Sequence, residues 1–217
     1  MTTQSDYKIY PVSDPKPFGH PMKEWIQKWW KWLLEIPEEI NPSNDFTGSK
    51  CSIGQVDPNV WFLAGAHIQR PHHTMATVNR QCDIPGDKAV GIVVAANELS
   101  KAEFPHLDDS QLIRYASEGN QLDFVELIID GSIVQKEDVL GAGITSDLFD
   151  VALPEDNIFG APHGPTKAVG HGYMIIVEGL SGGQSHKIIF TQVTREHVPS
   201  RTPTFGYKIT YHLNVKS

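Results

Sequence analysis

The sequence predicts a mainly β protein: an antiparallel β-sandwich of jelly-roll-like form, with an N-terminal amphipathic helix packed on it and one further short helix. Short segments rich in Val, Ile, Thr and aromatic residues recur over residues 60–215, separated by turns that contain Gly and Pro. No regular helices alternate with these segments, so a parallel α/β fold would lack its crossover connections. Four of the five tryptophans lie in one helical segment near the N-terminus.

The tryptophan-rich segment spans residues 21–36 and reads PMKEWIQKWWKWLLEI. At about 100° per residue its apolar positions fill roughly 200° of a helical wheel. Burying four indoles represents roughly 15–25 kcal/mol of gross stabilisation, so we expect the helix to dock across the open face of a sheet. An interfacial membrane helix, a partner-binding surface and a sugar-stacking platform are the alternative interpretations. The mixed charge of the polar face argues against the membrane.

The β segments can be assigned by composition, and the hairpin between two of them by its turn residues. Asp130-Gly131 is a strong two-residue hairpin signal. Alternation in the last segment places its apolar side chains on one face and His212 on the other. A short helix is expected over residues 109–118, capped by Asp108 or Asp109. The expected strands are Val60–Ala66, Thr74–Ile84, Ala89–Ala95, Leu122–Ile129, Ser132–Gln135, Asp147–Leu153, Thr166–Glu178, Lys187–Thr194 and Tyr207–Val215.

Length and composition indicate a single domain over residues 1–217, with an extended arm at 1–19, the helix at 21–36 and the sandwich at 60–215. The formal net charge of −8 and the scattered basic residues disfavour nucleic acid as a partner. No apolar run approaches the ~20 residues of a membrane span. The N-terminus does not resemble a secretory signal, which predicts a cytoplasmic protein; removal of a signal upstream of this numbering would make it extracellular.

The chain has two cysteines, Cys51 and Cys82, and neither belongs to a CxxC pair. Their spacing alone leaves a disulfide and two free thiols open. A disulfide would close a loop of about 30 residues and contribute roughly 3–4 kcal/mol, provided the compartment is oxidising.

Several motifs in order resemble a broad group of uncharacterised microbial proteins, many of them exported. They are the Gly19-His20 pair before the tryptophan-rich helix, the NP…D-x-TG…C…GQ pattern of residues 41–55, VWFLAG at 60–65, C-x-IP-x-x-KA at 82–89, and the hairpin of residues 172–190. The resemblance covers most of the chain and implies no established activity. It supports the fold class and implies that Cys51 pairs with Cys82. Exported members begin with a signal peptide, whereas this sequence does not.

Ten histidines supply the best material for chemistry, because imidazole is the commonest transition-metal ligand. His67, His72 and His73 follow an apolar strand and could face one divalent transition metal, with Glu98 or His106 completing the shell. No HEXXH motif or cupin-like H-x-H…E spacing supports this site, and exposed loop histidines are the simpler interpretation. His163 and His171 bracket a Gly-rich segment where the backbone could approach a ligand closely.

Two functions follow from these observations. The first is a non-catalytic binding or interaction module for a glycan, a protein or a surface polymer, which needs no cofactor. The second is a metal-dependent enzyme with a loop-histidine site. No spacing signature supports the metal-dependent enzyme, so we favour the module; a GxSxG elbow and a phosphate-binding loop are absent as well. The oligomeric state and the ligand do not follow from the sequence.

Overall fold

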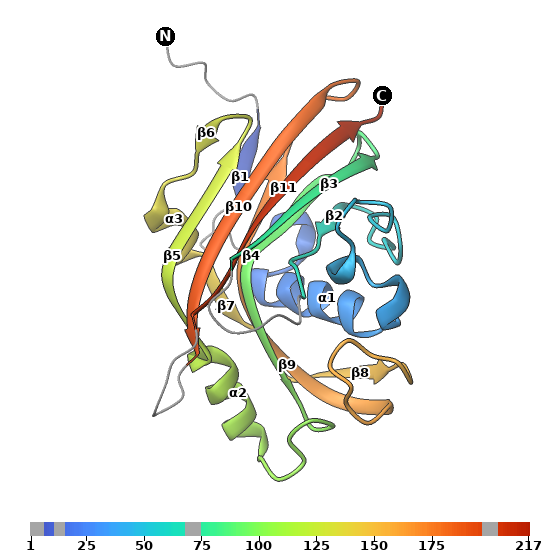
Figure 1. Cartoon of the computed structure of the whole chain (residues 1–217), viewed down its shortest axis with the longest axis vertical. Helices are drawn as coiled ribbons and strands as arrows, with labels where there is room; N and C mark the ends of the chain where they lie inside the picture. Colours follow the sequence, from blue (N-terminus) through green and yellow to red (C-terminus); the bar gives the residue numbers. More distant parts are fainter. Residues whose placement is uncertain (1–6, 11–15, 68–74, 197–203) are drawn as a thin grey trace.

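The computed structural model describes residues 7–10, 16–67, 75–196 and 204–217, and it forms two sheets that face each other (Figure 1). Sheet A has the order β1-β9-β4-β2, with β7 and β8 also paired to β9, and sheet B has the order β3-β11-β10-β5-β6. The strands are β1 (Lys8–Tyr10), β2 (Val60–Leu63), β3 (Met75–Ile84), β4 (Ala89–Ser100), β5 (Asn120–Ile129), β6 (Ser132–Ile133), β7 (Gly143–Thr145), β8 (Phe149–Leu153), β9 (Gly164–Glu178), β10 (Ser185–Glu196) and β11 (Thr204–Val215).

The main hydrophobic core lies between the two sheets and contains alternate residues of their strands. In β11 the inward residues are Tyr207, Ile209, Tyr211, Leu213 and Val215, all of which are buried, while His212 is exposed as expected. The predicted hairpin joins β5 to β6, where Asp130 and Gly131 both have positive φ, at 49° and 80°. Two successive positive φ values match the twist of a tight hairpin, and both Asp and Gly tolerate them.

Helix α1 (Met22–Leu34) covers the opposite face of sheet A, and in Figure 1 it lies across β4 from β5 and β10. Its four tryptophans are at most 8% exposed. Two glycines of β9 make this close approach feasible, because a Cβ on Gly170 would overlap the ring of Trp30 and one on Gly172 would come within 2.8 Å of Ile26. In the Gly-rich segment between His163 and His171 and just after it, these two glycines thus allow close packing of α1, and the space above them is not open to a ligand.

Each indole N–H of α1 donates to a backbone carbonyl, which removes the cost of burying a polar group with the ring. The acceptors lie on four separate segments: Pro17 for Trp25, Leu63 for Trp29, His171 for Trp30 and Ile53 for Trp32. The tryptophans thus connect α1 to the chain before it, to β2, to β9 and to the loop before β2. The expected helix on a sheet is confirmed, and none of these rings is available as a stacking platform.

The β-sandwich class is confirmed, but strictly antiparallel pairing is wrong. β2 runs parallel to β4, and β3 runs parallel to β11, so both sheets are mixed. Each parallel pair places a strand at one edge of its sheet, and pairing direction at an edge leaves no mark on strand composition. Jelly-roll connectivity is not confirmed.

Further elements occur in stretches where none was predicted. β1 lies within the segment expected to be an extended arm, and helix α3 (Lys136–Gly141) and β7 lie between the expected strands Ser132–Gln135 and Asp147–Leu153. Helix α2 (Asp109–Glu118) matches its prediction, and Asp108 forms a capping box with Gln111. The remaining helical turns are η1 (Pro17–Gly19), η2 (Glu38–Ile40) and η3 (Pro42–Asn44). Among the described residues, no helix has the length and apolar character needed to cross a membrane.

Cys51 and Cys82 form a disulfide that joins the loop before β2 to β3, with their Cα atoms 5.9 Å apart. The loop also follows the edge of β3 through its backbone, since the Gln81 N–H donates to the Thr47 carbonyl at 2.8 Å. Gly48 packs so closely on Gln81 that a Cβ there would overlap its backbone. The disulfide and these contacts together cover the edge of β3, which would otherwise present unpaired backbone groups.

Candidate functional site

The histidines of the described chain do not converge. His67 lies just beyond β2, His106 and His163 are exposed, and His171 is buried on β9. No group of three or more His, Cys, Asp or Glu side chains capable of holding a metal occurs among residues 7–10, 16–67, 75–196 and 204–217. His72 and His73 lie outside these ranges, so the predicted metal site at His67, His72 and His73 stays a prediction.

His67 and His171 both lie in surroundings that disfavour the protonated imidazole. Burial lowers the pKa of His67, and the negative charge of Glu38 partly opposes this shift. The His67 ring packs edge-on against Phe159 at 5.3 Å between centroids. Burial also lowers the pKa of His171, whose Nδ1 lies 2.9 Å from the Thr145 hydroxyl. His171 thus has a local partner on the neighbouring strand β7.

Arg80 is the most buried charge of the molecule described here, with 1% of its surface exposed. It lies at an inward position of β3, where strict alternation would place an apolar side chain. The guanidinium donates to the Tyr211 hydroxyl and to the carbonyls of Ser43, Asp45, Ala64 and Gly65. Because all its acceptors belong to the protein, Arg80 joins two loops to the core of sheet B and is not available to a ligand.

Glu98 is a second buried ionisable residue, and it lies on the face of sheet A that α1 covers. It pairs with Gly170 in the β4–β9 register, so its side chain shares the face on which Trp30 packs. Neither carboxyl oxygen has a hydrogen-bond partner. Burial raises the pKa of Glu98 well above its ordinary value, and the nearby negative charge of Glu103 adds to the shift. Glu98 is a predicted ligand of the histidine metal site, but among the described residues no histidine joins it in a metal-binding group.

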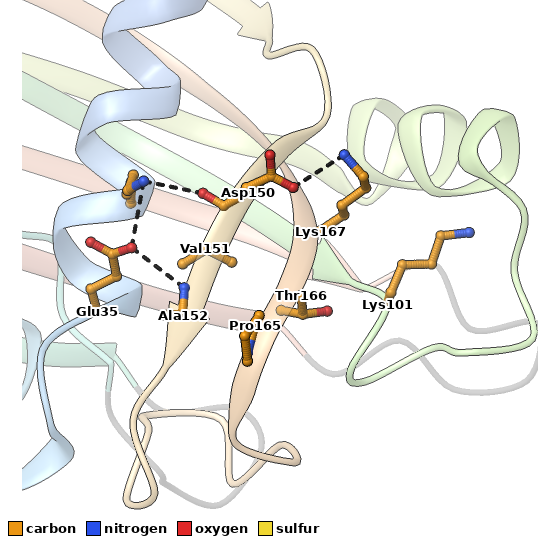
Figure 2. Close-up of a pocket in the computed structure, with 9 residues that line it drawn as sticks. Glu35, Lys101, Asp150, Val151, Ala152, Pro165, Thr166 and Lys167 are labelled. Atoms are coloured by element: carbon orange, nitrogen blue, oxygen red, sulfur yellow. Dashed lines mark hydrogen bonds and ion pairs between the residues drawn. The ribbon is translucent and has the colours of Figure 1, made fainter.

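The structure also contains an open groove, which we call the lysine groove, with a volume of about 620 Å³ (Figure 2). It combines residues from α1, the turn after β4, β8 and β9. Its lining residues are Lys31, Glu35, Lys101, Asp150, Val151, Ala152, Pro165, Thr166 and Lys167.

One wall of the lysine groove is formed where α1 meets the free edge of β8. Lys31 Nζ donates to the Asp150 carbonyl at 3.2 Å, and Glu35 accepts from the Ala152 N–H at 3.4 Å. These two side chains are one helical turn apart and also pair with each other at 3.6 Å. They therefore satisfy backbone groups of an edge strand, and Figure 2 shows Glu35 beside that edge.

The opposite wall carries two further ammonium groups. Lys167 pairs with Asp150 across β8 and β9 at 3.1 Å, and Lys101 pairs with Asp109 of α2 at 2.9 Å. The Asp150 side chain is 85% exposed and that of Lys167 is 53% exposed. Exposed pairs of this kind contribute only about 0–1 kcal/mol. Lys167 can consequently exchange its present partner for a ligand at little cost, whereas Lys101 also donates to the Leu107 carbonyl at 2.6 Å.

Between these charges, the floor of the lysine groove contains both apolar and polar side chains. Val151 pairs with Thr166, and Ala152 pairs with Pro165 in the β8–β9 register. The groove thus offers three cations, two carboxylates, a hydroxyl and a small apolar surface. No sequence motif marks it, because its residues come from four separate elements. The one signal in the sequence is the i,i+4 spacing of Lys31 and Glu35 on the polar face of the predicted helix.

Comparisons of this chain with protein-family models, curated proteins and solved structures gave no match.

Proposed function

We propose that this protein is a non-catalytic β-sandwich module that binds an acidic glycan in the lysine groove. The observation that carries the proposal is the gathering of Lys31, Lys101 and Lys167 around one open groove, on a chain whose formal net charge is −8. Three ammonium groups from three elements provide sites for the carboxylates of uronic acid units. Such charge-assisted hydrogen bonds are roughly twice as strong as neutral ones.

The other lining residues suit the remaining parts of a sugar. Glu35 and Asp150 can accept hydrogen bonds from hydroxyl groups, and Thr166 can donate or accept. Ala152 and Pro165 offer a small apolar surface to the C–H face of a pyranose ring. The open shape of the groove admits a chain that enters and leaves at its ends, as a polymer requires. The Cys51–Cys82 disulfide also supports encounter with a surface polymer, since disulfides persist in oxidising compartments.

Binding to polygalacturonate and alginate oligomers, measured by isothermal titration calorimetry at low ionic strength, tests this proposal. We expect binding to both acidic polymers and none to neutral dextran. Lys167→Ala should raise the dissociation constant about tenfold, which corresponds to loss of one charge-assisted contact. Lys136→Ala removes an exposed lysine outside the groove and should leave it unchanged. Equal binding to dextran, or an equal effect of both substitutions, would contradict the proposal.

A further inference from the structure

The outer face of sheet B carries more apolar surface than a solvated sheet face requires. Phe124 is 45% exposed and Met75 is 49% exposed. None of the three helices described packs its buried residues here: those of α1 lie on sheet A, those of α2 beside Val169, and Val139 of α3 in the core between the sheets. The apolar side chains of this face are Met75, Phe124, Ile128, Ile133, Ile189 and Val193.

Strand register arranges the centre of this face in rows that cross β11, β10 and β5. The first row has a small residue at one end and a large one at the other: Gly206, Val193 and Phe124. The second has opposite charges at its ends: Lys208, Thr191 and Glu126. The third is Thr210, Ile189 and Ile128. In each row the middle residue lies on β10.

We propose that a second copy of this chain docks face to face on the outer face of sheet B, about a two-fold axis parallel to β10. This rotation exchanges β11 with β5 across the interface while β10 faces itself. Lys208 then meets the partner's Glu126, and Glu126 meets the partner's Lys208. Phe124 meets the partner's Gly206, over which the side chain of that copy's Met75 lies, so the two apolar side chains come into contact. The face is therefore complementary to itself in charge, and it places apolar side chains against each other in the neighbouring row.

The charges select this axis over the other aligned arrangement. A two-fold axis that lies in the interface but crosses the strands near Thr191 would place Lys208 against Lys208 and Glu126 against Glu126. Like charges brought together in an interface cost several kcal/mol. Neither side chain makes an ion pair within the described part of the chain, so both are available to a partner.

The face is large enough for a stable dimer. Four strands spaced about 4.8 Å apart and ten residues long at about 3.3 Å each give roughly 600 Å² per copy. Two copies would bury roughly 1,200 Å², at the lower end of specific protein–protein interfaces and above most crystal contacts. Sheets pack face to face in this aligned manner within proteins as well.

Sedimentation-velocity and light-scattering measurements on the full chain test the proposal. We expect a mass of twice the 24.1 kDa chain at high protein concentration, and dissociation on dilution. Lys208→Glu or Glu126→Lys should each raise the dissociation constant about 100-fold, because each creates two like-charge contacts. The double variant K208E/E126K should restore the dimer, since the charges match again. Glu155→Lys, the same change of charge on the turn after β8, is the control.

Circular dichroism establishes that each variant is folded, and Phe124→Ser provides a second variant that removes an apolar contact instead of a charge. A monomeric mass over the whole concentration range would overturn the proposal. A dimer that withstands both charge reversals, or a double variant no better than the single ones, would overturn it too. These outcomes are independent of glycan binding, because no residue of the lysine groove belongs to sheet B.

Discussion

Substitution of Trp29 tests the role of the tryptophan-rich helix most directly. The side chain is 2% exposed, packs edge-on against Trp30 at 4.9 Å between centroids, and donates its indole N–H to the Leu63 carbonyl at 2.9 Å. Trp29→Ala removes the ring and the donor together. Trp29→Phe keeps most of the apolar volume and removes the donor. Comparing the two variants separates packing from hydrogen bonding.

The expected magnitudes follow from this environment. A buried indole removes about 150–250 Å² from water, worth roughly 4–6 kcal/mol at about 25 cal/mol per Å². Alanine retains part of this, the site relaxes partially, and measured costs for such substitutions are about 3–5 kcal/mol. We expect that loss of unfolding free energy for Trp29→Ala. For Trp29→Phe we expect about 1–3 kcal/mol, the cost of leaving a buried carbonyl such as that of Leu63 without its donor.

Urea unfolding followed by far-ultraviolet circular dichroism measures both values. Ile113→Ala on α2 is the control, because Ile113 is 38% exposed and its loss should change the unfolding free energy by no more than about 0.5 kcal/mol. A Trp29→Ala variant that unfolds with almost wild-type stability, while losing binding to acidic glycans, would refute the reasoning. It would mean that the tryptophans form a ligand platform rather than the support of sheet A.

Two further predictions concern the disulfide and a buried carboxyl. Replacing Cys51 and Cys82 together by serine should lower the unfolding free energy by roughly 3–4 kcal/mol, since the disulfide spans 31 residues; an equal loss on adding reductant to the wild type, and none in the variant, would assign the effect to the bond. Because burial raises the pKa of Glu98, the folded state retains a proton that the unfolded state releases, so stability falls as pH rises from the ordinary glutamate pKa to the raised value. Glu98→Gln should therefore be more stable than the wild type at neutral pH and equal to it near pH 4 by thermal unfolding, whereas a gap that stays constant with pH would contradict the assignment.

Much of the fold could be predicted from the sequence because local patterns dominate it. The helical period of the tryptophan-rich segment, the Asp130-Gly131 turn and the alternation of β11 each identify an element without reference to distant residues. Partners across the sheets are a different matter. The parallel pairing of β2 with β4 depends on loop paths that carry no composition signal. β1 has only three residues, and among the described strands it pairs with β9, so it is too short for a periodic pattern of apolar residues to reveal it.

The candidate site could not be predicted for the same reason. The lysine groove exists because Lys31 reaches the edge of β8, 119 residues away, and because β9 brings Lys167 beside Asp150. The structural role of Arg80 could have been predicted from the sequence, since it is the one charged residue among the inward positions of β3, which are otherwise apolar. A charge at such a position must be surrounded by hydrogen-bond acceptors. The predicted metal site depended on the residue type of His67, His72 and His73 alone, whereas the described histidines make separate local contacts.

The two proposals meet in the geometry of the sandwich. Helix α1 covers the outer face of sheet A, whereas no helix of the described residues covers the outer face of sheet B, and a dimer formed there leaves every residue of the lysine groove outside the interface. Each dimer would then carry two grooves, one beside each sheet A. When a repeating glycan spans both, the second contact is intramolecular, and the apparent affinity can exceed that of one groove by about 100-fold or more. The charge-reversed Lys208→Glu variant should therefore bind short oligomers as the wild type does and long polymers more weakly. Equal weakening for both lengths would show that Lys208 acts on the groove itself.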